Sequence, residues 1–137
     1  MKPIFAVLSK LAVLLFAACA VAQSGDGKTT RDQITPARAI AAARHMRDQL
    51  NDPDSLRVTS FLYYEPSAPD VHYLCVVFRA KNEYGATVLQ TYSNNAADDS
   101  PGGFNNDVVW SILCKGPVVL DATDAVKAAL KADREKE

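Results

Sequence analysis

The 137 residues of the chain are enough for one compact domain with its own hydrophobic core. Fifteen basic residues stand against 16 acidic ones, so the near-neutral charge gives no indication of nucleic-acid binding, and no basic cluster indicates a membrane-surface protein.

Residues 1–22 have the pattern of a secretory signal peptide. A short basic start precedes an apolar segment over residues 11–18, and the small residues 20–22 form a cleavage site. Lys10 interrupts the apolar stretch, which argues against a permanent transmembrane helix. Cleavage after Ala22 would leave an acidic chain, which we expect to be exported, periplasmic or secreted, with no transmembrane span.

Cys19 offers a second route of processing. Residues 16–19 read Phe-Ala-Ala-Cys and resemble a bacterial lipoprotein box, in which the cysteine is acylated and becomes the first residue. Phe16 stands where leucine is usual in that motif. A lipid anchor on Cys19 would change the location of the protein without changing its fold.

Cys75 and Cys114 are the two cysteines that follow the leader. In an oxidising compartment an even pair is typical of a disulfide, although two buried thiols or a metal pair are alternatives. A bond that closes a loop of about 40 residues would stabilise the fold by roughly 4 kcal/mol in the chain-entropy model.

A polar tether is predicted over residues 23–34, followed by a single domain over residues 35–137. Thr35 suits the N-cap of a first helix and Pro36 its first position. Pro53 should end the helix two or three residues before itself. Apolar residues at helical spacing form one stripe on this helix: Ala39, Ile40, Ala43, Met46 and Leu50.

Three strands are predicted in the middle of the chain. Residues 57–64 are rich in β-branched and aromatic side chains, and the densest apolar run after the leader begins at Tyr73. A third strand is predicted over residues 86–92. Asn82 and Gly85 suit the first and last positions of the turn that joins the second and third strands.

The last third of the chain contains a long polar loop, a strand and a helix. The loop covers residues 93–107, and apolar alternation predicts a fourth strand over residues 108–115. Asp121 can cap a final helix. The predicted fold is α+β: an N-terminal helix packed on an antiparallel sheet of about four strands, a C-terminal helix and one disulfide.

The polar loop is the best candidate for a recognition loop, because a long loop on a disulfide-bearing scaffold often carries binding residues. Its oxygen-bearing side chains could bind calcium, but they lack the ordered spacing of an EF-hand, so we predict a solvated connection and no metal site. The candidate residues are Asp98, Asp99, Asn105, Asn106 and Asp107.

No motif supports a specific reaction, and neither a catalytic residue nor a cofactor is predicted. His45 and His72 have no metal ligand at a suitable spacing and no nucleophile placed beside them by a motif. Arg38, Arg44 and Arg47 on the first helix could bind an anion or simply be solvated. Five aromatic residues could line a carbohydrate-binding face or pack the core: Tyr63, Tyr64, Tyr84, Tyr92 and Trp110.

Two segments carry a resemblance to known proteins. Residues 50–55 read Leu-Asn-Asp-Pro-Asp-Ser, and residues 75–85 read Cys-Val-Val-Phe-Arg-Ala-Lys-Asn-Glu-Tyr-Gly. Together they resemble small, mostly uncharacterised bacterial exported proteins that carry a helix-ending LxDPxS signature and a cysteine-bearing strand with an AKNx(F/Y)G turn. The chain departs from them after Cys75 and after Gly85, where a further glycine is common. The resemblance implies export and this organisation, and it transfers no catalytic residue.

The preferred function is a non-enzymatic exported module that binds a protein or a cell-envelope component. The alternatives are a small secreted hydrolase with a site assembled from distant residues, and a purely structural envelope protein. A pocket with converging ionisable groups would favour the hydrolase, and a flat exposed apolar or aromatic patch would favour binding.

Overall fold

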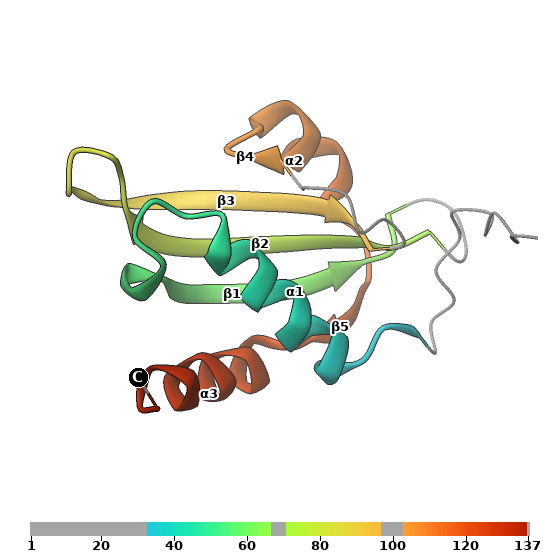
Figure 1. Cartoon of the computed structure of the whole chain (residues 1–137). Coiled ribbons are helices and arrows are strands. Elements are labelled where there is room, and N and C mark those ends of the chain that lie inside the picture. Colours follow the sequence, from blue (N-terminus) through green and yellow to red (C-terminus); the bar gives the residue numbers. More distant parts are fainter. Residues whose placement is uncertain (1–32, 67–70, 97–102, 137) are drawn as a thin grey trace, which may run out of the picture.

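A five-stranded antiparallel sheet forms the centre of the molecule, and two helices, α1 and α3, pack on one of its faces (Figure 1). The computed structural model describes residues 33–66, 71–96 and 103–136. The order of the strands in the sheet is β4-β3-β2-β1-β5. In chain order the elements are α1 (Pro36–Asp48), the short 3₁₀ helix η2 (Pro53–Ser55), β1 (Arg57–Tyr64), β2 (Tyr73–Lys81), β3 (Thr87–Asn95), β4 (Gly103–Phe104), α2 (Asp107–Leu113), β5 (Val118–Asp121) and α3 (Thr123–Arg134).

The predicted α+β class is confirmed, including the N-terminal helix on the sheet, the C-terminal helix and the disulfide. Helix α1 begins where its capping residues predict: the Thr35 side chain accepts a hydrogen bond of 3.3 Å from the backbone N–H of Arg38. The side chains of Ala39, Ala43 and Met46 are fully buried. Because two of these three residues are alanines, the helix can lie close to the sheet.

The main core lies between the sheet and helices α1 and α3. Along β2 the side chains of Leu74, Val76 and Phe78 are buried in this core, as period-two alternation requires. Strand β1 contributes Phe61 and Tyr63 to the same layer. The central pair of strands is therefore fixed by its buried face, since a shift of one residue would turn these side chains away from the helices.

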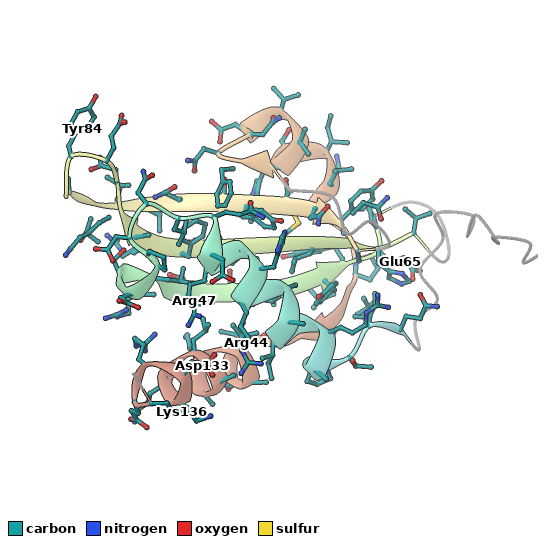
Figure 2. The ribbon with its side chains drawn as sticks, in the orientation of Figure 1. Arg44, Arg47, Glu65, Tyr84, Asp133 and Lys136 are labelled. Atoms are coloured by element: carbon teal, nitrogen blue, oxygen red, sulfur yellow. A yellow bond between two sulfur atoms is a disulfide. The ribbon has the colours of Figure 1, made fainter. Side chains whose placement is uncertain are left out.

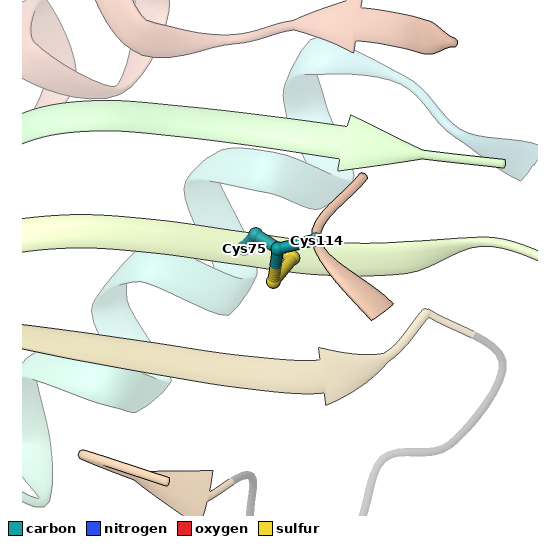
Figure 3. Close-up of a disulfide and its surroundings, with 2 residues drawn as sticks. All are labelled: Cys75 and Cys114. Carbon is teal, nitrogen blue, oxygen red and sulfur yellow. A yellow bond between two sulfur atoms is a disulfide. The ribbon is translucent and has the colours of Figure 1, made fainter. Parts of the chain in front are cut away.

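The predicted disulfide joins Cys75 of β2 to Cys114, the C-cap residue of α2, with Cα atoms 5.8 Å apart. Cys75 is buried, and it alternates with Leu74 and Val76, so its side chain points to the sheet face opposite α1. Figure 3 shows Cys114 approaching β2 from that opposite face. The bond therefore holds the end of α2 against the back of the central strand.

The predicted strand over residues 108–115 is wrong, because this segment forms helix α2. The side chain of Asn106 caps the helix by accepting a 3.0 Å hydrogen bond from the backbone N–H of Val109, and Asp107 lies in the first turn. Val108 and Ile112 are exposed on this helix. An Asn-Asp pair before an apolar run is a helix-start signal, and here it outweighs the apolar alternation.

A strand that was not predicted, β5, follows Gly116 and Pro117 and pairs with β1. Its four residues are too few for a clear alternation pattern, so only the pairing with β1 identifies it. Asp121 ends β5, and its side chain accepts a 2.9 Å hydrogen bond from the backbone N–H of Thr123, at the start of α3. The side chain of Thr123, and after it this backbone hydrogen bond, lowers the pKa of the Asp121 carboxyl.

Reducing the disulfide should lower the free energy of unfolding by about 2–4 kcal/mol, because the bond between residues 39 positions apart restricts the unfolded chain. Urea denaturation of the oxidised and the reduced wild-type protein measures the difference without any change of sequence. Equal urea midpoints for the two forms would contradict the expected stabilisation.

The turn between β2 and β3 gives a second stability prediction. Gly85 has a φ of +80°, and no atom lies within 4 Å of the position that a Cβ would take, so a substitution is penalised by the backbone conformation alone. Gly85→Val should lower the free energy of unfolding by more than about 1 kcal/mol, and Gly85→Asn by clearly less, since asparagine tolerates this conformation. Glu83→Ala, at an exposed turn residue, should change it by less than about 0.5 kcal/mol. A greater loss for Glu83→Ala than for Gly85→Val in urea denaturation would show that the backbone conformation does not govern the turn.

Candidate functional site

A pocket of about 350 Å³ lies between α1 and strands β1, β2 and β3. This volume is within the range of roughly 300–1,000 Å³ that is common for small-molecule sites. Helix α1 contributes residues at positions i, i+3, i+4 and i+7, which form one stripe along the helix. The lining residues are Arg38, Ala41, Ala42 and His45 from α1, Tyr63 from β1, Leu74 from β2, Tyr92, Asn94 and Asn95 from β3, and Ala96 after β3.

Tyr63 is the most informative of these residues. Its side chain points toward the helices with that of Phe61, and the two rings meet edge to face. Only 4% of Tyr63 is exposed, yet its hydroxyl makes no hydrogen bond with the residues that the structure describes. The fully buried polar side-chain atoms without a hydrogen bond in the described residues are Nε and Nη1 of Arg47, so the Tyr63 oxygen is accessible although most of the ring is not. The pocket therefore contains a hydrogen-bonding group without a protein partner.

The environment of Tyr63 combines an apolar surrounding with a nearby positive charge. Burial raises the pKa of the Tyr63 hydroxyl to about 12, while the charge of Arg38 acts in the opposite direction. Arg38 and His45 are both exposed, and neither forms an ion pair or a hydrogen bond through its side chain within the described ranges. None of the ten lining residues is acidic. The pocket therefore offers an unpaired cation beside a free hydroxyl.

The three arginines of α1 do not form one anion site. Arg44 pairs with Asp133 of α3 through two hydrogen bonds of 2.8 and 2.9 Å, which hold the pKa of the Asp133 carboxyl below its ordinary value. Arg47 also comes from α1 (Figure 2). Its Nε lies 3.5 Å from Oδ1 of Asp48. The Nε and Nη1 atoms of Arg47 are buried without a hydrogen bond. Of the three arginines, only Arg38 lines the pocket.

His72 is buried and paired, which was not predicted. Its Nε2 atom lies 3.0 Å from Oε2 of Glu65, and the His72 side chain is 0% exposed. Glu65 directly follows β1, and His72 directly precedes β2. Residues that flank the connection between two antiparallel strands meet at the same end of the sheet, so their positions in the sequence were a usable signal. The pair does not line the pocket.

The residues of the candidate recognition loop are divided among different roles. Asp98 and Asp99 lie outside the described residues. Asn105 has a φ of +52° and bonds to Thr91 of β3 through both its backbone N–H and its side-chain oxygen, at 2.9 and 3.0 Å. Asn106 caps α2, and Asp107 belongs to its first turn. Asn105 and Asn106 therefore hold the backbone in place.

Two chemical groupings considered from the sequence are not assembled in the described part of the chain. Within residues 33–66, 71–96 and 103–136 no group of three or more histidine, cysteine or acidic side chains could hold a metal ion. The aromatic residues are dispersed: Tyr84 is 85% exposed at the hairpin tip, Tyr63 and Tyr92 are buried at the pocket, and Trp110 is half-buried on α2. Within these ranges they do not make one carbohydrate-binding face.

Among the described helices, none has the length and apolar character needed to cross a membrane. Comparisons of the chain with protein-family models, with curated proteins and with solved structures gave no match.

The raised pKa of Tyr63 predicts a loss of stability at high pH. Between pH 10 and about 12 the unfolded chain releases the Tyr63 proton and the folded chain retains it, so the free energy of unfolding falls as pH rises. The contribution of this residue is full below pH 10, and a complete loss would amount to roughly 2–3 kcal/mol.

Urea denaturation at several values between about pH 9.5 and about pH 11.5 measures this effect. Tyr63→Phe should show a shallower decline than the wild-type protein. Tyr84→Phe, at the exposed hairpin tip, is the matched control for the loss of one phenol. Parallel curves for Tyr63→Phe and the wild-type protein would show that burial of the Tyr63 hydroxyl does not shift its titration.

Proposed function

We propose that the chain is a non-enzymatic exported module that binds a protein or a cell-envelope component, and that the pocket between α1 and the sheet is its binding site. The observation that carries the proposal is the largely buried side chain of Tyr63, whose accessible hydroxyl has no partner in the described structure and lines a pocket with largely apolar walls. Apolar walls combined with a few polar groups are typical of sites that bind small ligands or single side chains.

Two features support export. The disulfide between Cys75 and Cys114 is of the kind that persists in oxidising compartments. Residues 1–22 have the composition of a signal peptide, and the alternative route places a lipid on Cys19. Either route would deliver the folded domain to the cell envelope or beyond it.

The chemistry of the pocket favours binding over hydrolysis. A pocket with ionisable groups was the feature expected of a hydrolase, and Arg38, His45 and Tyr63 are such groups. However, its ten lining residues include no serine, threonine, cysteine or carboxylate. His45 would have no nucleophile to activate among them and no carboxylate to orient its ring. These side chains can hold and orient a ligand by charge and hydrogen bonding.

A hydrolase remains the second candidate because of the pair formed by His72 and Glu65. A histidine held by a carboxylate is the arrangement that a general base needs. The His72 side chain is 0% exposed, however, so a substrate could reach it only after the surrounding chain had moved. The open pocket at Tyr63 requires no such movement.

The proposal is tested by blocking the pocket in the full chain. Ala41→Trp places an indole at an exposed pocket-lining position of α1, and Ala128→Trp makes the same change at an exposed position of α3 outside the pocket. Native mass spectrometry of protein recovered from the producing cells should detect a bound component in the wild-type protein and in Ala128→Trp, and little in Ala41→Trp.

Equal retention of the component by the two tryptophan variants would place the binding site elsewhere. Hydrolysis of simple aryl esters by the wild-type protein, lost in His72→Ala and retained in Ala41→Trp, would favour the hydrolase.

A further inference from the structure

We propose that the pocket binds a small amphiphile that has one oxyanion head, a carboxylate or a phosphate monoester, joined to a short apolar chain. This inference rests on the proposed function and specifies its ligand. It follows from three properties of the pocket: the unpaired polar groups, the sign of the charge, and the shape and chemistry of the walls.

Tyr63 and Arg38 are the residues that would bind the oxyanion head of the ligand. The Tyr63 hydroxyl can donate a hydrogen bond to an oxyanion, and such bonds to charged acceptors are stronger than those between neutral groups. The guanidinium of Arg38 has a planar set of donors that fits carboxylate and phosphate oxygens. Arg38 and Tyr63 line the same pocket of about 350 Å³, so both groups can reach one small ligand.

The charge of the pocket selects an anion over a cation. Arg38 and His45 lie seven residues apart on α1, at the spacing of two helical turns, and both face the pocket. Among the lining residues no acidic group opposes them. Arg44, by contrast, is already paired with Asp133 and does not line the pocket. Of the three arginines of this helix, Arg38 is therefore the one whose charge lies at the pocket.

The walls of the pocket fit an apolar body. Ala41, Ala42 and Leu74 present aliphatic surface, and the rings of Tyr63 and Tyr92 add aromatic surface. Burying an alkyl chain here gains about 0.8 kcal/mol for each methylene group. A volume of about 350 Å³ suits a short chain and leaves little room for the two chains of a phospholipid.

Isothermal titration calorimetry with octanoate, octyl phosphate, 1-octanol and acetate tests the assignment, with each amphiphile kept below its micelle concentration. At least one of the two octyl anions should bind saturably, and 1-octanol should bind about tenfold more weakly or worse, because it lacks the charge that Arg38 recognises. Acetate, which lacks the apolar chain, should bind still more weakly than the octyl anion. A preference for octanoate assigns the head as a carboxylate, and a preference for octyl phosphate assigns it as a phosphate.

Matched variants test the residues. Arg38→Gln should weaken binding of the octyl anion by about tenfold or more and abolish the preference over 1-octanol. Arg44→Gln makes the same change of charge on the same helix, outside the pocket, and should change the affinity by less than about threefold. Tyr63→Phe should also lower the affinity for the octyl anion more than the affinity for 1-octanol. Tyr84→Phe, which removes an exposed phenol hydroxyl outside the pocket, is its control.

Three results would overturn the assignment: no saturable binding of either octyl anion, equal affinities for the anions and 1-octanol, or equal effects of Arg38→Gln and Arg44→Gln. A native component that is lost in Ala41→Trp, together with a failure of both octyl anions to bind, would leave the proposed function standing and show that the ligand class is wrong.

Discussion

The contact between α1 and the sheet determines where the candidate site can form. Ala39 and Ala43 are fully buried, and their small side chains allow the helix backbone to approach the strands closely. Met46 extends the same buried stripe. The neighbouring stripe of α1, which consists of its pocket-lining residues, therefore lies over Tyr63. The side chains of this stripe leave an open space between the helix and the strands. The core packing of one helix face thus creates the pocket beneath the next face.

The pocket differs from several polar sites of the domain that are satisfied by partners within the chain, although Nε and Nη1 of Arg47, outside the pocket, also lack a hydrogen bond. At the turn, Asn82 bonds to two backbone N–H groups, and near β4 Asn105 bonds to both backbone groups of Thr91. Arg44 is paired with Asp133 in the same way. The side chain of Tyr63 is largely buried, yet its hydroxyl has no such partner in the described part of the chain. Unpaired polar groups gathered at an accessible pocket are the pattern expected of a site that receives its partner from outside.

Local sequence patterns predicted the elements that depend on local chemistry. Strand β1 was placed at its observed bounds, and α1 at its observed capping residue, because apolar periodicity and Thr35 act within a few residues. The prediction of a strand at α2 was wrong because the apolar residues of this segment fit both the helical and the strand period. In addition, the helix exposes Val108 and Ile112, so their apolar character does not report a buried face. The pocket could not be predicted from the sequence, because residues from α1 and three strands form it together. The different roles of the arginines also depend on tertiary structure, since Arg44 pairs with Asp133 of α3 and Arg38 lines the pocket.

The disulfide and the pocket depend on the same short stretch of the sheet. Leu74 lines the pocket, and Cys75, the next residue of β2, carries the disulfide on the opposite face. Tyr63 is the residue of β1 that pairs with Leu74 in the strand register. The disulfide from Cys114 therefore restrains β2 from the sheet face opposite the pocket. Strand β2 carries Leu74, which forms part of the pocket wall and pairs with Tyr63. Because the link restrains backbone and not ligand-facing side chains, it stabilises the site without occupying any of its binding groups.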